Sequence, residues 1–262
     1  SMGVHGKTGG RNAPTVWNSA FHGVQFWDGR APLLEDQAKG PVANPIEMGR
    51  KDVDTAMDRV RAIPGYKPYF DAAFGEDSMT VDNAAKAVAA FERTLITPNS
   101  AYDNYVKGDK QAMTAQQVKG METFQSVGCT SCHSGAAFNG PQTLGKGFYA
   151  KFPTFADHDF EHKSNFSADP GREEVTSKAA DNNMFSVTKM SIITDTATYF
   201  HNGAVNDLSE AVRVLAKTQL NRDLSDEEVT DIVAFLAALT GPYPEITMPR
   251  LPATSGYSLV AE

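Results

Sequence analysis

The sequence contains two cysteines, three positions apart and followed directly by a histidine, in Gly128-Cys129-Thr130-Ser131-Cys132-His133. This C-x-x-C-H pattern is typical of the attachment site of a c-type haem. The two thiols would add to the two vinyl groups of the porphyrin, and His133 would place an imidazole nitrogen on the iron as proximal ligand. We therefore expect a helical turn that brings both cysteines to one edge of a haem buried in the core.

Three other interpretations of the motif are weaker. A structural zinc site needs four ligands, and the sequence has no second cysteine pair. A thioredoxin-type redox pair would not require His133 and should follow a β-strand. A structural disulfide between Cys129 and Cys132 stays open but leaves His133 unexplained. Covalent haem is the leading interpretation.

Composition indicates an ordinary globular protein with room for one large or two small domains, because 41% of the 262 residues are hydrophobic and 21% are charged. The net charge of −8 argues against nucleic-acid binding and suits a basic protein partner. No apolar run reaches the length of a membrane span, and nothing resembles a signal peptide. Because c-type haem is normally attached outside the cytoplasm, we expect a periplasmic protein whose leader was removed.

Apolar residues recur at helical spacing along much of the chain, as at Val53, Met57, Val60 and Ile63. Strand signals are nearly absent, so the sequence predicts an all-α fold. The expected helices cover residues 33–39, 52–63, 66–74, 80–96, 100–105, 208–219 and 225–239, with a further helix beginning at 114. Gly40-Pro41 should end the first helix, and Ser225-Asp226-Glu227-Glu228 is a capping sequence.

The sequence changes character near Lys107-Gly108-Asp109, where we expect a domain boundary. Residues 1–110 would form a first domain, 111–242 would form a cytochrome c-like domain, and 243–262 would pack back on the first domain as a strap. Residues 134–183 are rich in Gly, Pro, Asp and Asn and show little periodicity, which is expected if loops wrap a haem. His158 and His162 could form a metal pair on a helix, although polar loop residues are the more ordinary interpretation.

The chain resembles the bacterial di-haem cytochrome c peroxidases over nearly its whole length. The resemblance rests on the C-x-x-C-H and on five further segments: Arg11-Asn12-Ala13-Pro14-Thr15-Val16, Gln25-Phe26-Trp27-Asp28-Gly29-Arg30-Ala31, Gln37-Ala38-Lys39-Gly40-Pro41, Ile46-Glu47-Met48 and Tyr199-Phe200-His201-Asn202-Gly203. The family has two cytochrome c-like helical domains, each with a covalent haem. It reduces hydrogen peroxide to water with electrons from a small cytochrome or copper protein, and its members are commonly homodimers.

The resemblance implies roles for individual residues. Cys129, Cys132 and His133 would hold the electron-transfer haem. Trp27 resembles the tryptophan between the two haems, although a tryptophan considered alone is more often part of a core. Gln37 and Glu47 resemble the pair beside the peroxide-binding iron, where Glu47 would move a proton between the two peroxide oxygens.

Two metal sites are also implied by the resemblance. His5 resembles the removable histidine on the peroxidatic iron, in a loop one residue shorter than expected. Asn12, Thr196 and the carbonyl of Thr198 resemble a calcium site at the domain interface, where oxygen ligands suit this hard cation.

The sequence departs from the family pattern at two main places. The family carries another C-x-x-C-H upstream of the His5 loop, and the 262 residues do not contain it. We therefore expect either that an N-terminal segment precedes this sequence or that the chain is a form unable to perform the full reaction. The usual sixth haem ligand is a methionine fourteen residues beyond the histidine of Tyr-Phe-His, and this position holds Leu215.

Loss of thioether ligation at Leu215 should lower the haem potential or free a coordination site. Met184 and Met190 are substitute ligands to consider. Ser191 stands where an arginine near the haem propionates is expected. Leu215 and the missing haem motif favour an alternative, a non-catalytic electron-transfer or haem-sensor protein, whereas Gln37 and Glu47 favour the peroxidase. A relative that oxidises a side chain of a partner protein is the third interpretation.

Overall fold

The computed structural model describes residues 2–253. This part of the chain is mostly helical, as the sequence predicts, and divides into two compact units. The smaller unit contains residues 2–9, 34–91 and 245–253, and the larger contains residues 10–33 and 92–244. The domain division near residue 110 and the strap at 243–262 stay predictions, and residues 254–262 of that strap lie outside the described residues. No helix within residues 2–253 is both long and apolar enough to cross a membrane.

The smaller unit is built from short helices joined by turns. They are the 3₁₀ turns η1 (Val4–Gly6) and η3 (Pro64–Tyr66) and the helices α1 (Leu34–Gln37), α2 (Gly40–Ala43), α3 (Val53–Arg61), α4 (Lys67–Phe74) and α5 (Val81–Glu92). The helical spacing predicted for α3 is confirmed, and its Met57 is buried. The prediction that Gly40-Pro41 ends a helix is wrong. Gly40 begins α2, because the first turn of a helix tolerates a proline that has no N–H to donate.

The larger unit contains the remaining elements. Its helices are α6 (Ala101–Val106), α7 (Ala115–Val127), α8 (Asp159–Ser164), α9 (Glu173–Thr176), α10 (Leu208–Leu220) and α11 (Asp226–Ala237). Its 3₁₀ turns are η2 (Ser19–Phe21), η4 (Cys129–Ser131), η5 (Phe166–Ala168), η6 (Ala179–Asp181) and η7 (Ile193–Asp195), and its strands are β1 (Tyr149–Lys151) and β2 (Met184–Ser186).

A short antiparallel sheet corrects the all-α expectation. β1 and β2 pair with Tyr149 opposite Ser186 and Lys151 opposite Met184. Strands of three residues are too short to give a readable alternation of apolar and polar residues, so the sequence pattern missed them. Residues 134–183 are accordingly less irregular than expected, because they also contain α8 and α9.

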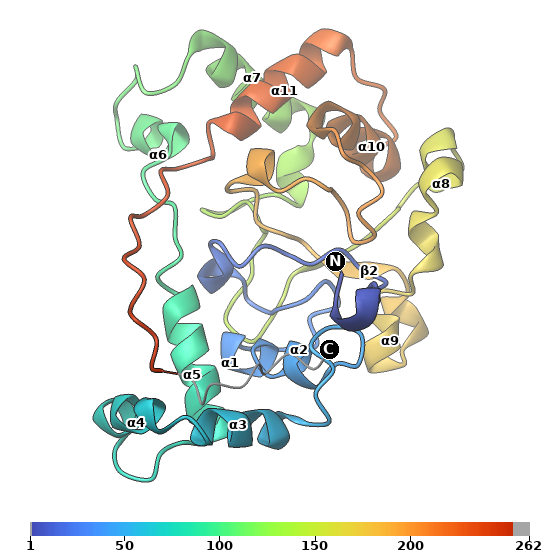
Figure 1. The fold of residues 1–262 in the computed structure, drawn as a ribbon. Coiled ribbons are helices and arrows are strands. Elements are labelled where there is room, and N and C mark those ends of the chain that lie inside the picture. The colour runs from blue at the N-terminus through green and yellow to red at the C-terminus, as the bar shows by residue number, and fades with distance from the viewer. Residues whose placement is uncertain (1, 254–262) are drawn as a thin grey trace. The chain divides into compact units, whose positions relative to one another are not determined.

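Two helices of the larger unit, α7 and α11, lie side by side (Figure 1). Each begins with a capping box, in which the side chains of Thr114 and Gln117, or of Ser225 and Glu228, bond to each other's backbone N–H groups. The capping predicted at Ser225 is confirmed. At the crossing, a Cβ on Gly120 would lie 1.8 Å from a backbone oxygen of α11, so only glycine permits this close approach.

The core of the larger unit has two aromatic clusters. In the first, Phe124 of α7 and Phe235 of α11 have ring centroids 5.3 Å apart and pack with Phe138. In the second, Phe152 and Phe166 have centroids 4.9 Å apart. Full burial of one such side chain contributes about 1.5–3 kcal/mol to folding. Both clusters contribute residues to the cavity described below.

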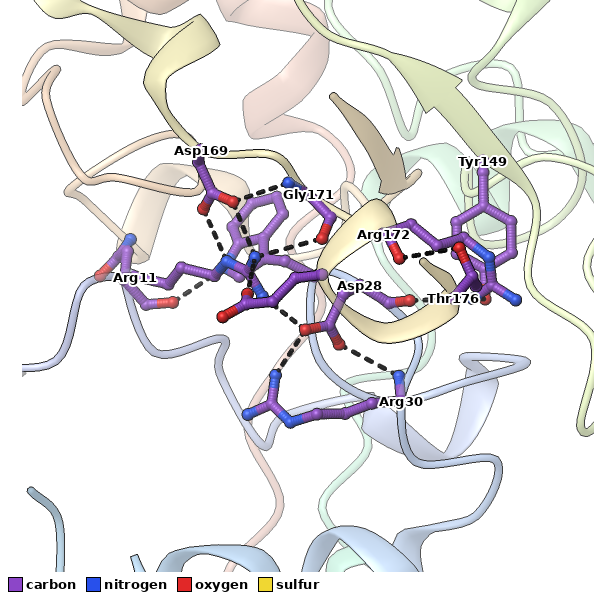
Figure 2. A network of polar contacts seen from close by, with 11 residues as sticks. Arg11, Asp28, Arg30, Tyr149, Asp169, Gly171, Arg172 and Thr176 are labelled. Atoms are coloured by element: carbon purple, nitrogen blue, oxygen red, sulfur yellow. Dashed lines mark hydrogen bonds and ion pairs between the residues drawn. The ribbon is translucent and has the colours of Figure 1, made fainter. Parts of the chain in front are cut away.

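An ion-pair network joins distant segments of the larger unit (Figure 2). The guanidinium of Arg11 contacts Asp28 at 2.5 Å and Asp169 at 2.6 Å, and Asp28 also pairs with Arg30 at 2.8 Å. The Asp28 side chain is 2% exposed, so its charge requires these partners. The network therefore holds segment 10–33 against the loop that contains Asp169 and precedes α9.

Candidate functional site

The C-x-x-C-H motif begins where α7 ends. Gly128 caps the helix with φ of 107°, a left-handed conformation that suits glycine, and turns the chain into η4. The backbone N–H of His133 then donates to the carbonyl of Cys129 at 2.9 Å, which brings the ends of the motif together. Cys129 and Cys132 are not joined by a disulfide, and burial raises the pKa of the Cys129 thiol to about 11.

His133 is held in one orientation by the loop that follows it. Its Nδ1 lies 2.8 Å from the carbonyl oxygen of Phe138 and acts as the donor to it. Burial lowers the pKa of His133, and the hydrogen bond to Phe138 opposes this effect. The neutral imidazole with Nδ1 protonated leaves the Nε2 lone pair available to a metal.

The motif forms part of the wall of a cavity of about 420 Å³, which is a typical volume for a ligand pocket. Cys129, Cys132 and His133 line it, together with side chains of both aromatic clusters. The apolar stripe predicted on α10 lies on the same wall, where Leu208, Val212 and Leu215 are exposed to the cavity. The wall is therefore apolar over much of its area, with a few polar groups.

The two methionines that could replace the missing sixth ligand differ in position. Met190 is buried and lines the cavity, and its backbone N–H donates to the carbonyl of Ala137 at 3.2 Å, next to the loop that orients His133. Met184 belongs to β2 and is not among the residues of the cavity wall.

His201 is one of two residues of the cavity wall, with Ser186, that have a buried side-chain polar atom without a hydrogen-bond partner among residues 2–253. Its side chain is buried and stacks on Phe185 with ring centroids 4.2 Å apart, yet its Nε2 has no hydrogen-bond partner. Burial lowers the pKa of His201, with the charges of Asp169 and Arg11 acting in opposite directions. A buried polar atom without a partner indicates that a group in the cavity would satisfy it.

Trp27 also lines the cavity, where hydrogen bonds join it to the candidate calcium ligands. Its Nε1–H donates to the carbonyl of Asn12 at 2.8 Å. The Asn12 side-chain amide donates to the carbonyl of Thr198 at 2.7 Å. Asn12 and Thr198 are therefore neighbours. If the side-chain amide of Asn12 turned by about 180°, its Oδ1 and the carbonyl oxygen of Thr198 would both be available to the same cation. Thr196 lies two residues earlier on the same segment and also lines the cavity.

The remaining predicted site residues lie in the smaller unit. The backbone N–H of Val4 donates to the carbonyl of Glu47 at 2.8 Å, so the turn that carries His5 lies against the loop that carries Glu47. A Cβ on Gly3 would lie 1.9 Å from the carbonyl oxygen of Ile46, so this contact is close. His5 is exposed, Glu47 is half-buried, and Gln37 is half-buried at the end of α1.

Comparisons with known proteins agree with this geometry. The family model described as di-haem cytochrome c peroxidase matches residues 1–111. The chain is 39% identical to a cytochrome c551 peroxidase of Nitrosomonas europaea, over 97% of this chain and 73% of that protein. The chain belongs to the di-haem cytochrome c peroxidase family. A cytochrome c551 peroxidase of Pseudomonas aeruginosa is 38% identical over 97% of this chain and 72% of that protein.

Structural comparison places the chain beside another branch of these di-haem proteins. The fold is similar to the crystal structure of a MauG-like protein associated with microbial copper homeostasis, with a TM-score of 0.78 and 26% identity over 92% of this chain and 78% of that one. A methylamine utilization protein MauG of Methylophilus methylotrophus is 31% identical over 92% of this chain and 71% of that protein.

The residues present suit the haem c that the family implies. The cavity has two thiols and a histidine nitrogen on one wall, an apolar lining, and the unsatisfied Nε2 of His201. A zinc site is not supported, because residues 2–253 contain no group of three or more His, Cys, Asp or Glu arranged to hold a metal. His158 caps α8 by accepting from the Glu161 N–H at 3.3 Å, and its Nε2 lies 2.6 Å from the carbonyl of Phe155, so both ring nitrogens are occupied.

Sequence reasoning missed two further residues of the cavity wall, His22 and Lys189. The backbone N–H of Lys189 donates to Nε2 of His22 at 3.3 Å. Burial, with a further contribution from the charge of Lys189, lowers the pKa of His22 to about 3. A signal was available for Lys189, because it is the one charged residue between Phe185 and Thr194.

Proposed function

We propose that the protein reduces hydrogen peroxide to water with electrons from a small cytochrome c or cupredoxin. In this reaction two electrons and two protons convert one peroxide molecule into two water molecules. The proposal rests on membership of the peroxidase family and on the cavity beside Cys129, Cys132 and His133. Family members act outside the cytoplasm as homodimers, and we extend a periplasmic location and a dimer to this chain.

Cys129 and Cys132 would hold the electron-transfer haem by thioether bonds, and His133 would bind its iron through Nε2. The Phe138 carbonyl fixes the ring of His133 by accepting from Nδ1–H. When bound, haem supplies the one-electron redox chemistry. Trp27 lies on the wall of the same cavity and, as in the family, would assist electron transfer toward the peroxidatic haem.

The proton chemistry belongs to the smaller unit. Glu47 takes a proton from one peroxide oxygen and delivers it to the other, which makes water the leaving group. Gln37 orients the peroxide by hydrogen bonding. His5 is the removable ligand, and the hydrogen bond between Val4 and Glu47 couples the His5 turn to the Glu47 loop. Asn12, Thr196 and Thr198 would hold calcium through oxygen atoms.

Leu215 favours a second candidate function. A leucine on the cavity wall offers no ligand to the iron, which suits a haem sensor or an electron-transfer protein as well as a peroxidase. Oxidation of a partner protein's side chain, the third interpretation of the sequence, is a further variant of this alternative.

The deciding experiment measures peroxide-dependent oxidation of a reduced small cytochrome c by the haem-loaded protein, with intact mass counting the covalent haems. Turnover together with two haems supports the peroxidase. One haem with no turnover, in a preparation that still exchanges electrons with the cytochrome, contradicts the peroxidase proposal for this chain and favours the electron-transfer alternative.

A further inference from the structure

Lys189 is a buried lysine of the larger unit whose charge lacks a counter-ion. It lies between β2 and η7 and is 6% exposed. Its Nζ makes one hydrogen bond, to the carbonyl oxygen of Thr15, at the long distance of 3.4 Å. No carboxylate of residues 2–253 forms an ion pair with it. Burying an ammonium without a charged partner is costly, so such a group on a cavity wall is suited to bind an anion.

The position of Lys189 indicates where this anion would lie. Lys189 and Thr15 both line the cavity that Cys129, Cys132 and His133 also line. The occupant expected there, a haem, carries two propionate carboxylates. Ser191, at the position where the sequence predicts an arginine near these propionates, is not part of the cavity wall. The positive charge on the cavity wall is therefore supplied by Lys189, two residues before Ser191.

We propose that Lys189 binds a propionate of the haem attached to Cys129 and Cys132, in place of an arginine at position 191. This inference rests on the proposed haem attachment. An ion pair between the ammonium and the carboxylate would satisfy both groups in a water-poor site, where Coulomb attraction is stronger than in water.

The other titratable groups of the wall do not provide this charge. Burial, followed by the charge of Lys189, keeps the pKa of His22 near 3, so His22 is neutral at pH 7. Burial also lowers the pKa of His201, and it raises the pKa of Tyr199. These three residues can donate or accept hydrogen bonds. Burial lowers the pKa of Lys189 itself to about 8, which still leaves it mostly charged at pH 7.

The test compares haem-loaded wild type with Lys189→Met, Lys189→Arg and the control Lys146→Met, which removes an exposed lysine away from the cavity wall. One measurement is the midpoint potential of the covalent haem at pH 7, obtained by spectroelectrochemical titration. The other is the resonance Raman band of propionate bending, which responds to hydrogen bonding at the carboxylate. Neither depends on peroxide turnover.

Lys189→Met should lower the potential, because the ammonium favours the less positive ferrous state, and should shift the propionate band. Lys189→Arg should keep both values near those of wild type, and Lys146→Met should leave both unchanged. Wild-type potential and band in Lys189→Met would overturn the inference. If Lys189→Met does not fold, Lys189→Gln provides the same comparison with a neutral donor, and an unchanged potential there would overturn it equally. Failure of wild type to attach haem at all would instead contradict the proposed attachment.

Discussion

The Nδ1 atom of His133 lies 2.8 Å from the carbonyl oxygen of Phe138. The two residues are five positions apart in the sequence. Because a carbonyl oxygen can only accept, the imidazole proton is on Nδ1 and the lone pair is on Nε2. The motif and its orienting partner therefore form one local unit.

The covalent attachment gives the first prediction. In the 262-residue chain, which contains a single C-x-x-C-H motif, replacing either Cys129 or Cys132 by serine should abolish the two-point attachment. The double replacement should remove the haem-stained band under denaturing conditions, because a hydroxyl cannot form the thioether. Thr130→Ala, between the two cysteines, is the matched control and should keep the stain. A stain that persists in the double variant would rule out this attachment.

Glu47 gives the second prediction. In the form of the protein that carries both haems, Glu47→Gln should lower peroxide turnover by about two to four orders of magnitude, the usual contribution of a general acid–base group. Haem content and the far-ultraviolet circular dichroism should not change. Glu76→Gln removes an exposed carboxylate of the same unit and should leave turnover unchanged. Near-normal turnover in Glu47→Gln would remove Glu47 from the mechanism.

His22 gives a prediction about acid stability. Burial, followed by the Lys189 charge, lowers the pKa of His22 from 6.5 to about 3 in the folded protein. Between these pH values the unfolded chain binds more protons at His22 than the folded chain does. The free energy of unfolding should therefore fall as the pH drops below about 6.5, by at most about 1.4 kcal/mol per pH unit.

Chemical denaturation of the haem-loaded protein between pH 4 and 7 measures this effect. His22→Gln retains an acceptor for the Lys189 N–H but cannot take up a proton, so its unfolding free energy should depend less steeply on pH. The same pH dependence in wild type and His22→Gln would show that other groups dominate acid unfolding.

Arg11 gives a prediction about stability that is independent of haem. Arg11→Met should lower the free energy of unfolding by about 3 kcal/mol, because it leaves the buried carboxylate of Asp28 with Arg30 as its remaining ion-pair partner in Figure 2. Lys163→Met breaks an exposed pair with Glu210 and should cost no more than about 1 kcal/mol. Equal losses in the two variants would mean that the Arg11 network contributes no more than a surface pair.

Local patterns account for what the sequence predicted correctly. The C-x-x-C-H motif, the capping sequence at Ser225 and the apolar stripe of α10 each lie within a few consecutive turns, so spacing alone identifies them. Resemblance to the family added candidate residues such as Glu47, whose role in proton transfer stays a prediction because no local pattern reveals it.

Long-range contacts account for what the sequence missed. Arg11 and Asp169 are 158 residues apart, and neither is unusual in its own segment. β1 and β2 are stabilised by each other and by neighbouring loops, with too few residues for a period of two to be visible. Lys189 is a lysine among apolar residues, but only the folded chain shows that it is buried on a cavity wall with no counter-ion among residues 2–253.

Leu215 gives the last prediction. It lines the cavity on the same helix stripe as Leu208 and Val212, and its methyl groups cannot bind iron. We expect the haem on His133 to be five-coordinate or bound by a ligand foreign to the family, with a lower potential than in family members. Leu215→Met should create a low-spin His–Met haem and raise the potential, because a thioether stabilises ferrous iron.

The spectrum of the oxidised protein checks this expectation, since thioether–ferric ligation gives a weak band near the red end. Leu215→Met should gain the band. Leu208→Met, two helical turns earlier on the same stripe, is the matched control and should not gain it. A band already present in wild type would mean that another methionine is the ligand. Met190 would be the first to replace, because it lines the cavity and Met184 is not among the wall residues. Loss of the band in Met190→Leu would then identify the ligand and show that Leu215 does not determine the coordination.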